Sequence, residues 1–208
     1  MICFTERGAW VCRRLFHKLR EAGGECEAVV PGRFLREEWK KEGMKEPGEE
    51  PLSQWTGRMF AEKRGMIFVS AAGIAVRAIA PWVRDKMTDP PVVSVDEGAQ
   101  FVIPLLSGHV GGANGLARRI AEWLRSTPVI TTATDVNGKF AVDLFASVYH
   151  MVITDRKEAK NISAAVLEGK HIGVFSDLPL KTLPEGFILG KHLEKNIQIT
   201  VNTELMPD

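Results

Sequence analysis

Cysteine and net charge are both scarce in this sequence of 208 residues. The three cysteines are odd in number and form no Cys-x-x-Cys pair, which argues against a disulfide framework or a redox motif. We expect reduced, buried thiols at Cys3, Cys12 and Cys26. The formal net charge is only +1, because 27 basic residues are balanced by 26 acidic ones. Without a long-range positive field, the chain is not expected to bind nucleic acid or a membrane surface.

A long apolar segment is also missing. The longest one, Met66–Val76, contains Ser70 and is stopped by Arg77, so it falls well short of the ~20 residues that a transmembrane helix requires. Near the start of the chain, Glu6 and Arg7 stand where a secretory signal would have apolar side chains. We therefore expect a cytoplasmic protein with no membrane span.

Three motifs of common enzyme and nucleotide-binding classes are absent. The sequence has no P-loop, no G-x-G-x-x-G dinucleotide fingerprint and no G-x-S-x-G nucleophile elbow, so Ser107 is a weak candidate for a nucleophile. Four of the five histidines stand alone without metal-ligand spacing. We expect no metal site and a structural role for His17, His150, His171 and His192.

The sequence does contain alternating apolar strands and amphipathic helices. Its 45% hydrophobic and 25% charged residues are ordinary globular values and allow one large domain or two small ones. A strand at 2–4, a helix at 10–19 and a strand at 28–30 form a β-α-β opening, which favours a parallel sheet. A buried strand at 66–69 and a strongly amphipathic helix at 116–124 continue the alternation.

Two further patterns complete the predicted architecture. The apolar runs 92–95 and 101–103 flank a polar turn with a glycine and predict a hairpin. Another strand is expected at 151–153, after which helix and strand patterns alternate again. We predict an α/β fold of two units with mainly parallel sheets, the first containing the hairpin. Their boundaries are predicted as domains 1–126 and 127–208.

Polar residues concentrate where the predicted strands end. In α/β sheets, ligands bind at strand carboxyl ends, where loops enter helix N-termini. The stretch Ser107–Asn114 (SGHVGGAN) is the most informative, because its glycines let the backbone approach a ligand and His109 can exchange a proton. The alternative is a tight turn around a structural histidine. A second loop, Thr131–Gly138, contains hydroxyl, carboxylate and amide groups that could bind a ligand. The alternative is that these side chains form a network of helix caps and Asx turns within the loop.

Charged residues beside these loops indicate further roles. Asp96 and Glu97 are adjacent carboxylates in the hairpin turn. One of them could orient or deprotonate a catalytic group, although solvated turn carboxylates are commoner. Arg77 interrupts an apolar helix four residues after Gly73, so its guanidinium must be paired or face a cleft, and it suits a carboxylate ligand.

Several of these segments occur together, in this order, in a known family. They are Gly73–Pro81, Asp85–Pro90, Val95–Gly98, Ile103–Asn114 and Thr131–Gly138. Together they resemble the CbiG family of cobalamin-biosynthesis proteins, the cobalt-precorrin-5A hydrolases of the anaerobic pathway, most densely from about 65 to 145. The resemblance implies opening of the δ-lactone of a cobalt-corrinoid, with loss of acetaldehyde, to give cobalt-precorrin-5B. It implies no resident cofactor, because the substrate carries the cobalt.

Residues and resemblance together predict a mechanism. His109 would be the general base, oriented by Asp96 or Glu97, or would instead ligate the cobalt of the substrate. Backbone amides around Gly111–Asn114 would hold the oxyanion or a substrate carboxylate. The expected substrate-binding residues are Gly73, Arg77, Lys86, Ser107, Gly108, Gly111, Gly112, Asn114, Thr132, Asp135 and Asn137.

The resemblance also bears on partners. Family members usually carry a further C-terminal domain, so we expect either a separate partner that supplies it or a truncated chain. A second hypothesis makes the chain a non-catalytic corrinoid-binding module that needs this partner. In both cases Arg77 and Lys86 would pair with peripheral carboxylates of the corrinoid. A third, a phosphate or nucleotide binder at the helix after Gly112, is weakened by the missing motifs. A homo-oligomer is left open.

Overall fold

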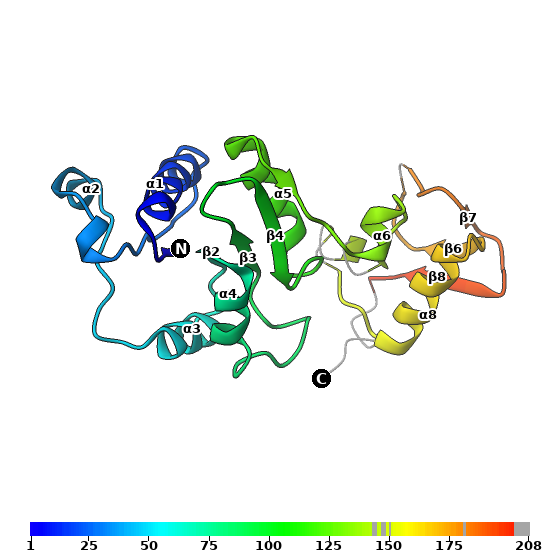
Figure 1. Ribbon diagram of the computed structural model, residues 1–208. Coiled ribbons are helices and arrows are strands. Elements are labelled where there is room, and N and C mark those ends of the chain that lie inside the picture. Colours follow the sequence, from blue (N-terminus) through cyan, green and yellow to red (C-terminus); the bar gives the residue numbers. More distant parts are fainter. Residues whose placement is uncertain (143–144, 147–148, 150, 181, 202–208) are drawn as a thin grey trace. The chain divides into compact units, whose positions relative to one another are not determined.

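The computed structural model describes residues 1–142, 145–146, 149, 151–180 and 182–201. The chain divides into two units, Met1–Ile130 and Thr131–Asp208. The first contains a five-stranded sheet in the order β1-β2-β3-β4-β5, and the second a three-stranded parallel sheet in the order β7-β6-β8 (Figure 1). The predicted α/β fold with mainly parallel sheets is confirmed.

Short apolar strands form the sheet of the first unit. They are β1 (Ile2–Cys3), β2 (Met66–Val69), β3 (Val92–Val95), β4 (Phe101–Leu106) and β5 (Thr127–Pro128). The first three run parallel to one another, and every residue of β2 and β3 is buried, as strands covered on both faces require. The fourth strand reverses direction and pairs antiparallel with β3, which confirms the predicted hairpin.

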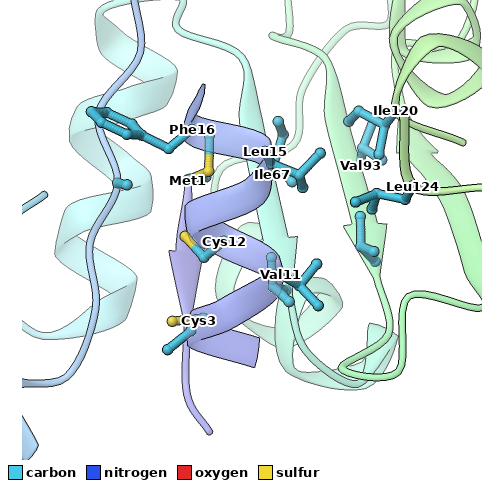
Figure 2. Close-up of a cluster of buried hydrophobic side chains, with 14 of the residues drawn as sticks. Met1, Cys3, Val11, Cys12, Leu15, Phe16, Ile67, Val93, Ile120 and Leu124 are labelled. Atoms are coloured by element: carbon cyan, nitrogen blue, oxygen red, sulfur yellow. The ribbon is translucent and has the colours of Figure 1, made fainter. Parts of the chain in front are cut away.

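Helices cover both faces of this sheet (Figure 1). They are α1 (Glu6–Glu21) and α5 (Ala113–Leu124) on one face, and α3 (Leu52–Ala61) and α4 (Ala72–Ile79) on the other. Successive strand side chains point to opposite faces, so Ile67 packs with α1 and α5 whereas Phe68 packs with α3 and α4. Figure 2 shows the first of these two cores, where side chains of α1, α5 and the strands meet.

The connection between α1 and α3 contains short elements. The predicted strand at 28–30 is wrong, because only Val29 pairs, through single bridges to β1 and to Lys45. Pro31 follows at once and has no N–H with which to extend a ladder. The chain continues through a 3-10 turn and a short helix, η1 (Gly32–Phe34) and α2 (Glu37–Lys41).

The three cysteines are free thiols. Cys3 and Cys12 are buried in the first core, as predicted, and Cys26 is only partly buried (Figure 2). A hydrogen bond with Cys3, reinforced by burial, raises the pKa of the Cys12 thiol well above its ordinary value. Cys12 therefore stays protonated and behaves as a small apolar residue of the core.

The second unit is smaller. Its elements are α6 (Ala133–Val136), α8 (Arg156–Leu167), β6 (Ile172–Ser176), β7 (Phe187–Leu189) and β8 (Lys195–Ile199). The central strand, β6, pairs in parallel with both neighbours, and α8 packs Ile162 and Val166 against Ile172 of that strand. The predicted strand at 151–153 is wrong. This segment is an irregular connection that leads into α8, with Val152 half exposed.

The division between the units falls a few residues beyond the predicted boundary at 126. Thr127 and Pro128 form β5, which pairs with β4 and so belongs to the first sheet. The units therefore separate after Ile130. Over the described residues, every helix is too short or too polar to cross a membrane.

One ion pair ties the connection after α2 to helix α1. Arg13 donates two hydrogen bonds to Glu42, Nε to Oε2 at 2.9 Å and Nη2 to Oε1 at 2.6 Å. His17 Nε2 lies 3.1 Å from the same Oε2. The bidentate Arg13 guanidinium is the main cause that lowers the pKa of Glu42 to about 2.

We predict that replacing Glu42 changes how stability depends on pH. Because the folded-state pKa of about 2 lies below the ordinary 4.5, the ionised carboxylate stabilises the fold above pH 4.5, and this contribution is lost as the pH falls toward 2. In denaturant unfolding, the free-energy difference between wild type and Glu42→Gln should shrink through that window. Glu25→Gln, which removes an exposed carboxylate that forms no ion pair with another described residue, is the control. A constant difference for Glu42→Gln would contradict the prediction.

Candidate functional site

The carboxyl ends of β1, β2 and β3 meet at one edge of the first sheet. After β1 the chain passes through α1 and reaches Val29, which pairs with one side of β1. It later passes through α3 and forms β2, which pairs with the opposite side of β1. The direction of travel across the sheet therefore reverses between β1 and β2. In open α/β sheets, ligands bind in the crevice outside the carboxyl ends at such a switch point.

A cavity of about 350 Å³ lies at this switch point. Its lining residues end or directly follow the three strands, or belong to the start of α4. They are Phe4, Thr5, Val69, Ser70, Ala71, Ile74, Asp96 and Glu97. The Thr5 hydroxyl accepts a hydrogen bond from the Gly8 amide at 3.0 Å and so caps α1. We call this space the switch-point cavity.

Of the two predicted catalytic carboxylates, Asp96 is used to build the hairpin turn. Its Oδ1 accepts from the amides of Gln100 at 2.9 Å and Phe101 at 2.6 Å, and its Oδ2 from Gly98 at 3.0 Å. This is the self-capping role that turn carboxylates commonly have. Glu97 is exposed and forms no side-chain hydrogen bond or ion pair with another described residue. Glu97 is therefore the carboxylate that a ligand in the cavity would meet.

The loop Ser107–Asn114 is anchored at its first residue. Ser107 is buried at φ 55°, and its hydroxyl donates a hydrogen bond to the Asp89 carbonyl at 2.8 Å. Asp89 is itself buried, and its Oδ2 accepts from the amides of Arg84 and Asp85. The loop is thereby fastened to the turn that precedes β3.

Glycine is required at three positions of the same loop. A Cβ on Gly111 would lie 2.4 Å from the Ser107 Cβ, and one on Gly108 would lie 2.7 Å from the Asn114 Oδ1. Gly112 has φ 83°, a conformation that residues with a side chain rarely adopt. These glycines shape the turn and leave His109, which is half-buried, near its tip.

Much of the hydrogen-bonding capacity expected for an oxyanion is used within the loop. The amide of Gly112 donates to the His109 carbonyl at 2.9 Å, and those of Ala113 and Asn114 donate to the two carbonyls at the start of the loop at 3.1 and 2.9 Å. The first turn of α5 is thus capped by its own loop. An anion at Gly111–Asn114 would have to displace these bonds.

His109 and the acidic pair lie at opposite edges of the sheet. Because β4 is antiparallel to β3, the loop after β4 emerges beside the start of β3, whereas Asp96 and Glu97 follow its end. The four residues of β3 lie between the two groups and span about 13 Å. The structure does not bring them together, so the predicted orientation of His109 by either carboxylate does not hold in this unit.

Three predicted substrate-binding residues lie on α4 or in the connection from α4 to β3. Gly73 is in the first turn of α4, near the switch-point cavity, and its carbonyl accepts a hydrogen bond from Arg77 Nη1 at 3.2 Å. Arg77 is exposed and folds back on its own helix. Lys86 is exposed in the turn Asp85–Asp89, the turn to which Ser107 is fastened. Lys86 therefore shares an edge of the sheet with the His109 loop.

The three predicted contacts from the second polar loop belong to the second unit. Thr132 Oγ1 donates to Asp135 Oδ2 at 2.7 Å, and Asn137 Nδ2 donates to the Ala133 carbonyl at 2.8 Å. Both bonds are local and lie within the loop itself, which agrees with the alternative foreseen for this loop, although the Thr132 side chain does not cap the backbone of α6. Their role toward a substrate stays a prediction.

A second cavity, of about 650 Å³, lies in the second unit. Four aromatic rings line it in a row, in the order Phe187, Phe140, Phe145 and Tyr149. The distances between the centroids of successive rings are 4.6, 5.2 and 4.7 Å. Sequence reasoning missed this cavity, because its walls come from segments that only folding joins. It also missed Thr5 in the first cavity, although a threonine just before an amphipathic helix is an N-cap signal.

Among the described residues, no group of three or more His, Cys, Asp and Glu side chains is placed to hold a metal ion. His17 contacts Glu42, and the ring of His192 lies 4.3 Å from that of Phe175. His150, which was expected to be structural, lies outside the described residues.

Two family models match consecutive parts of the chain. Residues 54–135 match the model described as Cobalamin synthesis G N-terminal, and residues 140–199 match the Cobalamin biosynthesis central region. Together they include the motifs at the switch-point cavity, the His109 loop and most of the second unit.

Two proteins with similar sequences are named cobalt-precorrin-5A hydrolases. The cobalt-precorrin-5A hydrolase of Salmonella typhimurium is 37% identical over 182 residues, which are 86% of this chain and 48% of that protein. The cobalt-precorrin-5A hydrolase of Priestia megaterium is 42% identical over 119 residues, 57% of this chain and 32% of that protein. The chain thus spans about half or less of the length of these relatives.

A solved structure supports the fold. A crystal structure of a cobalamin biosynthesis protein G homolog from Sulfolobus solfataricus aligns with a TM-score of 0.52 at 22% identity, over 95% of this chain and 58% of that one. The family matches and the relatives agree with the resemblance carried by the sequence motifs. The chain belongs to the CbiG family of cobalamin-biosynthesis proteins and contains its N-terminal and central regions.

Proposed function

We propose that this chain acts in opening the δ-lactone of a cobalt-corrinoid, the reaction of a cobalt-precorrin-5A hydrolase. The observation that carries the proposal is the loop Ser107–Asn114, whose buried anchor and required glycines hold one histidine in a defined place. This loop lies within the region that matches the family model. The relatives at 37 and 42% identity that bear the name of this activity support it further.

The chemistry requires a group that accepts protons. In the proposed reaction, water adds to the lactone carbonyl and the acyl C–O bond breaks, which yields a carboxylate and an alcohol. When the alcohol then loses its proton, the neighbouring C–C bond can break: two carbons leave as acetaldehyde, and the bonding electron pair passes into the macrocycle. An imidazole is the side chain most often used for such proton transfers, which assigns this role to His109.

The two edges of the sheet differ in their suitability for a polyanionic substrate. At the switch-point cavity, Asp96 and Glu97 would repel the peripheral carboxylates of a corrinoid. The cavity volume of about 350 Å³ is also at the lower end for small-ligand pockets. The opposite edge carries His109 together with the exposed Lys86. We therefore assign the corrinoid to the edge of the His109 loop.

Removing the imidazole should slow turnover without unfolding the protein. Since general-base catalysis contributes typically about 10²–10⁴-fold, we expect His109→Ala to lower acetaldehyde release from the cobalt-corrinoid lactone by about that factor. His171→Ala, at an exposed histidine of the second unit, is the matched control and should be unaffected. Near-normal turnover in His109→Ala would show that His109 is not the general base.

The same variant separates the base from the cobalt-ligand role. If His109 ligates the cobalt of the substrate, the visible absorbance of the bound corrinoid should differ between wild type and His109→Ala, because an axial nitrogen ligand changes the metal's electronic transitions. If His109 acts only as a base, the two spectra should coincide while turnover falls.

The shape of the loop should matter as much as its histidine. Gly111→Ala places a Cβ 2.4 Å from the Ser107 Cβ, so the loop must move and acetaldehyde release should fall at least tenfold, about 1.4 kcal/mol of barrier. Gly115→Ala is the matched control, because a Cβ there meets nothing within 4 Å and alanine favours a helix. Equal activity of both variants would contradict a positioning role for the loop.

Charge at the two edges gives a further prediction. In a spectral titration with the corrinoid, Lys86→Ala should raise the dissociation constant several-fold, because it removes a cation from the proposed binding edge. Glu97→Gln should leave it unchanged, because Glu97 lies at the other edge. A changed dissociation constant for Glu97→Gln, with that of Lys86→Ala unchanged, would instead indicate that the substrate binds at the switch-point cavity.

A second candidate function is a corrinoid-binding module without catalysis. The observation that favours it is the first turn of α5, where the amides expected to hold an oxyanion donate hydrogen bonds within their own loop. Incubation of the 208-residue chain with the cobalt-corrinoid lactone distinguishes the two functions. Release of acetaldehyde supports the hydrolase, whereas tight binding without product supports the module.

A further inference from the structure

Arginine and tryptophan side chains gather on helix α1 and the segment that leads into α2. This surface lies within residues 1–53, which precede the part of the chain that matches the family models. All five cation–π contacts among the described residues fall between residues 10 and 39. Such contacts occur about once per 70–80 residues in proteins, so this density is unusual.

Two indole rings form the centre of the cluster. Trp10 of α1 and Trp39 of α2 meet edge to face, with ring centroids 4.8 Å apart. The Arg36 guanidinium lies 4.6 Å from the Trp10 ring centre and 5.4 Å from that of Trp39. A second guanidinium, that of Arg13, lies 5.6 Å from the Trp39 ring and is paired with Glu42. Of these two arginines, only Arg13 forms an ion pair with a carboxylate of another described residue.

The surface around Trp10 carries further cations without partners. Trp10 is 40% exposed although it is a large aromatic residue. Arg7 and Arg14 lie three residues before it and four after it, so the three side chains share one stripe of α1. Within the described part of the chain, Arg7, Arg14 and Arg36 are exposed and form no ion pair or hydrogen bond through their side chains.

Two nearby lysines, in contrast to these arginines, form ion pairs with glutamates. Lys18 pairs with Glu21 at 2.8 Å, and Lys40 pairs with Glu37 at 3.0 Å. Around the exposed indole, by contrast, lie three guanidiniums that form no ion pair with another described residue. The group is called the arginine–tryptophan patch and consists of Arg7, Trp10, Arg14 and Arg36.

The chemistry of the patch specifies a partner. Tryptophan and arginine are the residue types that most often dominate the binding energy of protein interfaces. A guanidinium held on aromatic rings also loses little freedom when it binds a carboxylate with two hydrogen bonds. Arg36 is such a donor, and together with Arg7 and Arg14 beside the same indole it fits a surface that presents carboxylates beside an apolar group.

We propose that the arginine–tryptophan patch docks an acidic segment of a protein partner. A symmetric contact between two copies would place the same arginines of each copy against one another, which opposes self-association. Nucleic acid fits less well, because it needs an extended basic surface. The net charge is +1, and Glu6 and Glu38 border the patch in sequence.

Two polyanionic probes test the proposal on the full chain. Poly-L-glutamate stands for an acidic protein segment, and a DNA duplex stands for nucleic acid, both titrated at low ionic strength by calorimetry. We expect poly-L-glutamate to bind, and Trp10→Ala and Arg36→Ala each to weaken binding about tenfold or more. Arg84→Ala, at an exposed arginine between α4 and β3, is the charge-matched control and should change binding little. Circular dichroism of each variant checks that it folds.

Four results would overturn the proposal. DNA that binds as tightly as poly-L-glutamate, and is lost in the same variants, would reassign the patch to nucleic acid. An equal loss in Arg84→Ala would show that binding follows overall charge and not the patch. Failure of poly-L-glutamate to bind would remove the acidic partner. A change of oligomeric state in Arg36→Ala, measured by sedimentation, would make the patch a contact between copies.

Discussion

The first unit depends on one constraint: β1, β2 and β3 pair in parallel and are buried on both faces. Parallel neighbours can be joined only by crossovers, and the apolar strands require cover on both sides, so helices pack on both faces. The chain must then reverse its direction of travel between β1 and β2. The switch-point cavity is the direct consequence, because loops on either side of the reversal leave a space between them.

The antiparallel strand β4 separates the chemistry of this unit into two edges. It carries the loop with His109 away from the carboxyl ends of β1–β3, where Asp96 and Glu97 remain. His109 is therefore not oriented by Asp96 or Glu97. Its loop is held in place at its start, since Ser107 is fastened to Asp89 and the glycines leave no space for side chains. The exposed Lys86 at that edge also suits the proposed substrate, which carries many carboxylates.

Local sequence patterns predicted some elements and not others. The helix of α5 and the hairpin of β3 and β4 were predictable, because their signals lie within short windows of periodic apolar residues and a polar turn. The predicted strands at 28–30 and 151–153 failed, because short apolar runs become strands only if a neighbouring ladder accepts them. The aromatic cavity of the second unit could not be foreseen, since only folding brings Phe187 onto the three rings between residues 140 and 149.

The sequence by itself determined the α/β class, the self-contained turns and the family, since apolar periodicity and ordered motifs are local properties. Only the tertiary structure decided which chemical groups share a site. Strand direction is set by pairing between distant segments, and it places His109 and Glu97 at opposite ends of β3 although they are twelve residues apart in the chain. The arginine–tryptophan patch likewise exists only because folding brings Arg36 onto the ring of Trp10.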